Sequence, residues 1–242
     1  MGAQAATRTA LLACALAAVA PKISAQLIVY EGFDYPLNTG LSSSANTGTG
    51  WTGNWTNNTW RTNSGSGEIS TGLTYAGLST VGNAAREVNG EDFRSFAEQS
   101  ASGTYWVSFL VQVDSTAHRD FGISLFDGGS EKVFMGQTLG ANGNLSLWQN
   151  PSYDSRNDSA AAPVANTPML FVAEFDMDSA KAWFWVDPTL SGGAPSYASA
   201  ENGAGGSSIS VFTFNSVRMY GSGGYFDEIR IGRTAADVGF GS

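Results

Sequence analysis

Cysteine and histidine are almost absent from this 242-residue sequence, which holds only Cys14 and His118. A single histidine with no neighbouring thiol or second imidazole excludes a zinc site of the His- or Cys-rich kind. A Ser-His-Asp triad would depend on this one loop residue. The sequence also lacks a phosphate-binding loop, a dinucleotide fingerprint and a paired-His motif. These absences argue against zinc enzymes, nucleotide-dependent enzymes and triad hydrolases, and we assign no catalytic residue.

Positive charge is also scarce. The sequence has 12 Lys and Arg against 21 Asp and Glu, a formal net charge of −9. Nucleic acids and anionic membranes are bound through clusters of Lys and Arg, so this balance argues against both as partners. It is compatible with neutral ligands, cations or a divalent metal. Solubility alone is the alternative explanation for the acidic surface.

The only long apolar run lies near the N-terminus. Ala10–Ala20 follows Arg8, and Ile23-Ser24-Ala25 places small residues before a cleavage point. This arrangement predicts a secretory signal peptide over residues 1–25, too short to be a stable membrane span. We therefore expect a secreted or cell-surface protein whose single domain covers residues 26–242.

Convincing helical periodicity is missing from the rest of the sequence, and short alternating runs take its place. In Gly103–Val113, for example, every second residue from Tyr105 onward is apolar. Many short strands separated by turns predict an all-β fold, a two-sheet antiparallel jelly-roll sandwich. The other strands are expected at Leu27–Glu31, Leu73–Ala76, Ala85–Val88, Phe93–Ala97, Phe121–Phe126, Lys132–Gln137, Leu145–Trp148, Met169–Met177, Lys181–Val186, Ile209–Tyr220 and Tyr225–Ile231.

A long segment rich in Gly, Ser, Thr and Asn, Leu37–Gly67, carries no strand pattern. Loops of this length are unusual in compact domains. Trp51, Trp55 and Trp60 lie within it, and a buried indole contributes a large apolar area. We expect these tryptophans to hold the loop against the sandwich.

The segment Phe171–Val186 predicts a hairpin with two different faces. A two-residue turn at Ser179-Ala180 would place Phe175 opposite Phe184 on an apolar face directed to the core. The other face would pair carboxylates with indoles. Its residues are Glu174 opposite Trp185 and Asp176 opposite Trp183.

Glu174, Asp176, Trp183 and Trp185 form our candidate ligand-binding site. A sugar ring stacks its C–H face on an indole while its hydroxyls bond to carboxylates, so this face suits a glycan or another extracellular polymer. The alternative is that both tryptophans pack under a loop such as Asn150–Asn166.

Five segments in order along the sequence carry a family resemblance. The sequence resembles secreted bacterial proteins with laminin-G-like, concanavalin A-like jelly-roll domains, which are common in Verrucomicrobia and Planctomycetes. Members often carry a C-terminal sorting tail with a Pro-Glu-Pro motif, which does not occur before Ser242, and the resemblance implies fold far more than activity. The segments are Leu27–Tyr35, Gly50–Trp55, Ser108–Gln112, Trp185–Leu190 and Phe226–Gly232.

The resemblance implies a structural calcium site. Asp227 matches an acid that binds Ca²⁺ in related sandwiches, together with backbone carbonyls that would here lie near Glu31 or Gly32. The pattern places Asp227 on the same strand face as Ile229 and Ile231, where a carboxylate needs a partner. The alternative is an aspartate that accepts backbone N–H groups at the rim of the sheet.

The resemblance also raises an enzymatic alternative. Glu174-Phe175-Asp176-Met177-Asp178 is similar to the Glu-x-Asp-x-Glu strand of laminarinase-type glycoside hydrolases, in which the outer acids act as nucleophile and general acid. Asp178 is one methylene shorter than that general acid and lies next to a turn, a position that aspartate favours. We therefore rank three functions: non-catalytic recognition of glycan or polymer, a structural surface or matrix protein, and a glycoside hydrolase.

Overall fold

The computed structural model describes residues 27–43, 47–57, 67–117, 120–138, 143–149 and 156–241. The predicted signal peptide, Trp60 and His118 lie outside these ranges. Within them, no helix is long and apolar enough to cross a membrane.

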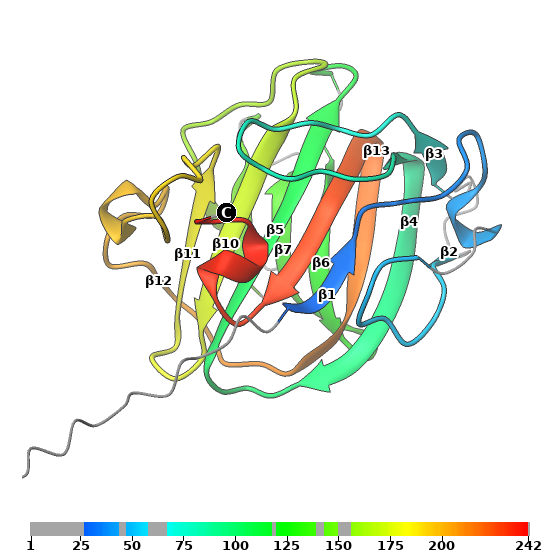
Figure 1. Cartoon of the computed structure of the whole chain (residues 1–242). Coiled ribbons are helices and arrows are strands. Elements are labelled where there is room, and N and C mark those ends of the chain that lie inside the picture. Colours follow the sequence, from blue (N-terminus) through cyan, green and yellow to red (C-terminus); the bar gives the residue numbers. More distant parts are fainter. Residues whose placement is uncertain are drawn as a thin grey trace, which may run out of the picture.

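The chain folds as an all-β antiparallel sandwich, as the sequence predicts (Figure 1). The strands follow the order β12-β11-β10-β5-β13-β6-β7-β8-β9, with β1 and β4 also paired to β13. Their bounds are β1 Leu27–Glu31, β2 Thr56–Asn57, β3 Glu68–Ser70, β4 Ala84–Gln99, β5 Thr104–Val113, β6 Phe121–Asp127, β7 Ser130–Gln137, β8 Ser146–Gln149, β9 Arg156–Asp158, β10 Met169–Asp176, β11 Lys181–Val186, β12 Ser207–Ser208 and β13 Phe214–Gly232.

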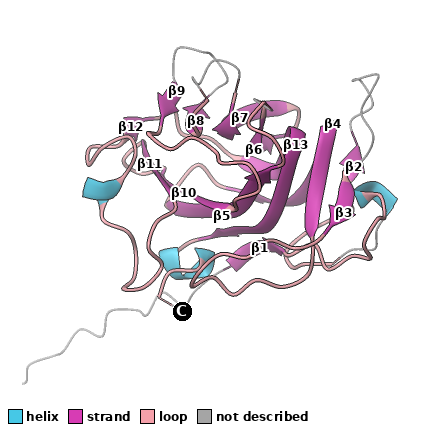
Figure 2. Cartoon of the chain, turned by 90° about the horizontal axis from the view of Figure 1, so that it is seen from above, coloured by secondary structure: helices cyan, strands magenta, loops and turns pink. Residues whose placement is uncertain are grey.

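The long strand β13 belongs to both layers of the sandwich (Figure 2). Its first half pairs with β6 and its second half with β5, and the register against β4 shifts between Gly221 and Gly224. The strand bends there, where a Cβ on Gly224 would lie 3.1 Å from the Cβ of Phe121. Glycine therefore lets the bend pack directly on the core.

This bend corrects the predicted strand boundaries. Ile209–Tyr220 and Tyr225–Ile231 were expected as separate strands, but the structure joins most of this region in β13. In the same way, Ala85–Val88 and Phe93–Ala97 are parts of one strand, β4. Leu73–Ala76 is not a strand and belongs to a loop. In each joined case, a short glycine- or polar-rich stretch that looked like a turn is a bend within a continuous strand.

The main core lies between the two layers. All five alternating residues of β5 from Tyr105 to Val113 are buried in it, as predicted. Phe171 stacks on Phe109 of β5 and on Phe184 of β11, with ring centroids 5.3 and 5.5 Å apart. Each buried aromatic ring contributes on the order of 2 to 3 kcal/mol of burial free energy.

A second apolar cluster covers the outer face of β5, β10 and β11. Its members on the strands include Trp106, Leu170 and Trp185, which alternate along the strands with residues of the main core. Three loop segments and the C-terminal 3-10 helix η4 (Ala235–Val238) lie over them (Figure 1). This layer is therefore buried on both faces, which explains the nearly unbroken burial along β5 and β10. The covering residues are Leu73, Leu78, Leu190, Ala200, Val238 and Phe240.

A buried ion pair fastens the N-terminal loop to the sandwich. Glu31 and Arg94 form a salt bridge with both side chains almost fully buried. The Glu31 carboxylate also accepts hydrogen bonds from Trp55 Nε1 (3.1 Å), Tyr35 Oη (3.0 Å) and the Phe33 amide (2.9 Å). Burial raises the pKa of Glu31, and the Arg94 charge and these bonds act against that rise.

Two of the three loop tryptophans hold the loop in place, as expected. Trp55 is buried, and its indole donates to Glu31. Trp51 donates from Nε1 to the Tyr30 carbonyl at 2.9 Å, and the Arg94 guanidinium lies 4.8 Å from its ring centroid. Both indoles therefore contact the buried Glu31–Arg94 pair, which holds the loop against the sandwich.

We expect Arg94→Met to lower the free energy of unfolding by about 3 to 5 kcal/mol, because it leaves the Glu31 carboxylate buried without its countercharge. Chemical denaturation measures this loss. The matched control is Arg86→Met, whose bridge to Asp114 is about one-third exposed and contributes less than about 1 kcal/mol. Equal losses in the two variants would contradict the special role of the buried pair.

Candidate functional site

The predicted hairpin exists, with the predicted faces but a different register. Phe175 and Phe184 are both fully buried in the main core, and Glu174, Trp183 and Trp185 lie on the opposite face. Glu174 pairs with Trp183 instead of Trp185, and Asp176 pairs with Lys181 instead of Trp183. The pairing is shifted by two residues, and an even shift leaves every side chain on its face.

Asp176 sets this register. Its Oδ1 accepts the amides of Asp178 (3.0 Å) and Ser179 (3.1 Å), and its Oδ2 accepts the Ser179 hydroxyl (2.6 Å). These bonds close a four-residue turn from Met177 to Ala180, longer than the predicted Ser179-Ala180 turn. They also lower the pKa of Asp176, the Ser179 hydroxyl contributing most. Asp176 therefore acts as a turn residue.

Trp185 does not offer a free ring to a ligand. The side chain is 2% exposed and stacks on Trp106 at 5.7 Å between centroids, with the ring planes 9° apart. The Tyr197 ring stacks on Trp185 as well, with the ring centroids 6.3 Å apart, and Nε1 of Trp185 donates to the Ser196 carbonyl at 3.2 Å. The expectation of an open face with two stacking indoles is therefore wrong for Trp185.

Trp183 is half-buried under the same segment. Its ring centroid lies 4.6 Å from that of Tyr197, and its Nε1 donates to the Ala204 carbonyl at 3.1 Å. The two tryptophans pack under a loop, as in the alternative interpretation. The loop is Ser196–Gly206, however, and not the predicted Asn150–Asn166.

Glu174 lies beneath this covering loop. Its side chain is buried, Oε1 accepts the Tyr197 hydroxyl at 3.0 Å, and Oε2 has no hydrogen-bond partner among the described residues. Burial raises the pKa of Glu174 to about 7, while the Tyr197 hydroxyl acts in the opposite direction. The carboxyl is thus a buried contact between strand β10 and the 3-10 turn η3 (Tyr197–Ser199).

We expect protonation of Glu174 to stabilise the fold. A carboxyl whose pKa is raised in the folded state stabilises fully below its unfolded value near 4.5, and this contribution is lost as the pH rises through 7. Between pH 4 and 8, the free energy of unfolding of Glu174→Gln should therefore fall by about 3 kcal/mol less than that of the wild type. Denaturation at a series of pH values measures the difference between the two slopes. Parallel slopes would show that this carboxyl does not titrate with folding.

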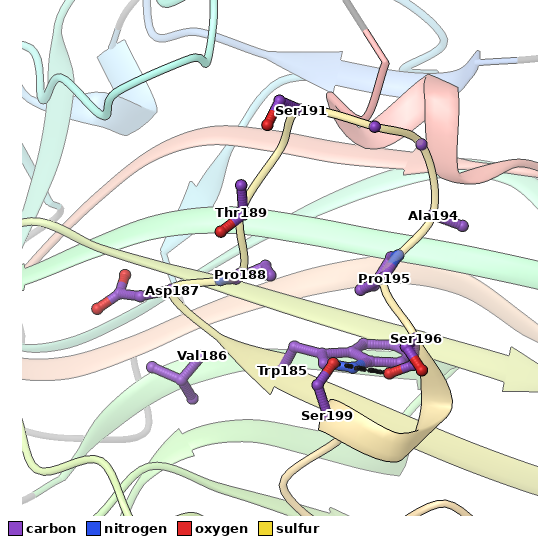
Figure 3. A pocket seen from close by; sticks show the side chains of 12 residues that line it. Trp185, Val186, Asp187, Pro188, Thr189, Ser191, Ala194, Pro195, Ser196 and Ser199 are labelled. Carbon is purple, nitrogen blue, oxygen red and sulfur yellow. Dashed lines mark hydrogen bonds between the residues drawn. The ribbon is translucent and has the colours of Figure 1, made fainter.

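A cavity of about 410 Å³ lies beside Trp185 (Figure 3). The loop that follows β11 arches around it, and the Trp185 indole bonded to Ser196 lies at one side (Figure 3). Small and hydroxyl-bearing residues dominate its wall. The full lining consists of Trp185, Val186, Asp187, Pro188, Thr189, Ser191, Gly192, Gly193, Ala194, Pro195, Ser196 and Ser199.

Local backbone bonds shape the loop around this cavity. Asp187 has a positive φ of 51°, its amide donates to the Leu170 carbonyl (2.9 Å), and its Oδ1 accepts the Leu170 amide (2.8 Å). Gly192 and Gly193 have φ values of 99° and 93°, which favour glycine. The Gly241 amide donates to the Leu190 carbonyl at 3.1 Å. The cavity is therefore built by the fold of the loop itself.

The cavity lining suits polar, uncharged ligands. Thr189, Ser191 and Ser199 are exposed and supply hydroxyls, and Asp187 supplies a carboxylate. Within the part of the chain that the structure describes, neither Lys nor Arg lines it. Among these residues, only Trp185 was predicted as a ligand-binding residue. The run Asp187–Pro195, with its prolines and Gly192-Gly193, was the available signal, because it predicts a shaped loop directly after an aromatic strand.

The predicted metal ligand Asp227 has hydrogen-bond partners in the structure. Asp227 is buried, and its oxygens accept the amides of Leu73 (2.8 Å) and Glu228 (2.7 Å). Burial raises its pKa to about 8. The other predicted ligands are backbone carbonyls near Glu31 and Gly32, and the Glu31 side chain itself is bonded to Arg94. The two amides are hydrogen-bond partners of the kind that the alternative expected for Asp227.

A bulge also changes the face that Asp227 occupies. The register between β13 and β5 shifts between Asp227 and Arg230, and Glu228 has a positive φ of 53°. Ile229 and Ile231 point into the main core, while Asp227 bonds to Leu73, a residue of the outer apolar cluster. The expectation that Asp227 shares a face with these isoleucines is wrong, because the bulge reverses the alternation.

Calcium at Asp227 stays a prediction. Among the described residues, no group of three or more His, Cys, Asp or Glu side chains could hold a metal ion. A structural ion would make EDTA lower the Tm by several degrees, and Asp227→Ala would abolish the response. An EDTA-insensitive Tm in the wild type would remove calcium from this account.

The two outer acids of the hydrolase-like pattern are not arranged as a catalytic pair. Glu174 is covered by Tyr197, whereas Asp178 accepts the Gly103 amide at 2.8 Å in the turn. Neither lines the cavity beside Trp185. This geometry does not favour the glycosidase alternative, whose chemistry needs both carboxyls at one substrate.

A second polar cluster lies on the layer of β6, β7 and β13. Arg218 donates to Glu131 (2.5 Å), Ser124 (2.9 Å) and Glu91 (3.3 Å), and its guanidinium lies 5.0 Å from the ring centroid of Phe126. Its charge is therefore matched within the protein. The cavity beside it measures about 120 Å³, below the usual size of a ligand site.

No protein-family model matches the sequence, and no curated protein matches it. Among solved structures, the chain is similar to domain 4 of AbnA, a GH43 extracellular arabinanase from Geobacillus stearothermophilus, in complex with arabinotriose. The TM-score is 0.53 at 16% identity, over 88% of this chain and 97% of that one. It is also similar to a receptor binding domain, with a TM-score of 0.51 at 9% identity over 88% of this chain and 49% of that one. These similarities agree with the all-β sandwich.

Proposed function

We propose that the chain is a non-catalytic recognition domain that binds saccharide in the cavity beside Trp185. The observation that carries the proposal is the cavity itself, about 410 Å³ in volume and lined by exposed hydroxyls and one carboxylate. Ligand sites are commonly 300 to 1,000 Å³, so the volume suits one or two sugar rings. Hydroxyls and carboxylates are the groups that bond sugar hydroxyls.

The chemistry of the loop supports this choice over the flat hairpin face. Trp185 keeps its ring stacked on Trp106 and thereby fixes one wall of the cavity. Asp187 is held by Leu170, so its carboxylate is already oriented before a ligand arrives. A pre-oriented polar group loses little conformational entropy on binding, which favours affinity for a small ligand.

The sandwich similar in fold, domain 4 of AbnA, has been solved with arabinotriose bound. We extend saccharide binding to this chain as a proposal. The resemblance to laminin-G-like proteins and the predicted signal peptide support this proposal. Sandwich domains that are secreted to the cell exterior meet extracellular polymers. A structural surface protein without a small ligand is the competing function.

We expect Ala194→Arg to weaken saccharide binding at least about tenfold, equal to about 1.4 kcal/mol. Ala194 is exposed and lines the cavity, so a long side chain there fills the space without disturbing the core. A glycan array with residues 26–242 finds the ligand, and isothermal titration calorimetry measures the change.

The matched control is Ala162→Arg, an exposed alanine in another loop that adds the same charge outside the cavity. It should bind as the wild type does. Absence of binding across a broad glycan array would leave the structural role as the better description. An unchanged affinity in Ala194→Arg would place the ligand elsewhere on the domain.

A further inference from the structure

A second cavity lies directly beside the first. Its volume is about 400 Å³, close to that of its neighbour. The two share one stretch of chain, Asp187–Ser191, which we call the strap. Residues of the strap line both cavities, namely Asp187, Pro188, Thr189 and Ser191. The second cavity adds Tyr75, Ala76, Gly77 and Leu190.

The strap is a fixed partition between these cavities. Leu190 is buried in the outer apolar cluster, and its carbonyl accepts the Gly241 amide at 3.1 Å. On the other side, the Tyr75 hydroxyl donates to the Pro188 carbonyl at 3.4 Å. The side chains of Thr189 and Ser191 remain exposed along the strap. A ligand lying across it would meet hydroxyls at the crossing point.

The two cavities differ in character but not in charge. The first is lined by hydroxyls and glycines, whereas the second holds the half-buried ring of Tyr75 against Leu190. An aromatic ring and an aliphatic side chain suit the C–H face of a sugar. Of the described residues that line the two cavities, Asp187 alone is formally charged, and none is Lys or Arg. Anionic sugars would meet a like charge without a compensating cation.

We infer that the two cavities are adjacent subsites for one neutral oligosaccharide that lies across the strap. This inference rests on the proposed saccharide-binding function and specifies its ligand class. Two linked units bind more tightly than one, because the second contact forms at a high effective concentration. Occupying both subsites therefore requires a chain of at least two sugar units.

The experiment is calorimetric titration with length series of neutral arabino-, xylo-, manno- and gluco-oligosaccharides. We expect the affinity to rise about tenfold or more from one unit to four units, owing to the second subsite. Ala76→Arg should abolish this gain, because the long side chain fills the second cavity. Ala76 is exposed and lines only the second cavity, whereas Ala194 lines only the first.

Two further measurements complete the design. Thr189→Arg, on the wall common to both cavities, should weaken every chain length, and Ala162→Arg should weaken none. Tetragalacturonate should bind at least about tenfold more weakly than the best neutral tetrasaccharide, since Asp187 repels it. Melting curves of each variant verify that the fold is intact.

The possible outcomes distinguish failure of the two-subsite inference from failure of the proposed saccharide binding. An affinity independent of chain length, or a length gain that survives Ala76→Arg, would overturn the two-subsite inference but not saccharide binding. Equal binding of tetragalacturonate would overturn the neutral ligand class. If no saccharide of any length binds, the proposed function and this inference both fail.

Discussion

The bond between Glu31 and Arg94 joins the two layers of the sandwich. Glu31 ends β1, opposite Ile229 in the second half of β13, whereas Arg94 lies on β4, opposite Val217 in the first half. Because β13 bends between these halves, the two side chains meet across the interior. A buried ion pair is stable only when the remaining polar atoms are also bonded. Trp55, Tyr35 and the Phe33 amide meet that need.

The candidate site depends on a different consequence of the fold, the covering of one layer on its outer face. Once Trp106 and Trp185 stack there, loops must bury them, since exposed stacked indoles would leave a large apolar patch. The loop after β11 does so through Leu190 and Ala200 and stays open between these anchors. The cavities are the parts of that loop region which apolar anchoring does not fill. The packing of the two indoles and the formation of the cavities thus have one structural origin.

Local patterns in the sequence predict much of this fold. Alternation correctly places Phe175 and Phe184 in the core, because side-chain faces survive a two-residue shift of register. The register itself depends on how the Asp176 carboxylate bonds the turn, which alternation does not encode. The bulge at Glu228 is equally invisible, since a positive φ is unusual for glutamate.

The site is less predictable because its partners are distant in the sequence. Tyr197 covers Glu174 from 23 positions away. Tyr75 reaches Pro188 across a separation of 113 residues. A single sequence gives no signal for such contacts, so the residues that cover Glu174 and Trp185 were missed.

The antiparallel pairing of β1 with the end of β13 has a mechanical consequence. Leu27 lies opposite Gly232, so the strands that begin and finish the described sandwich are immediate neighbours. Tension applied to both would act across the ladder and separate its hydrogen bonds one after another instead of shearing them together. A tether attached at these points would therefore open the domain under a small force. Single-molecule stretching would register this as early release of β1.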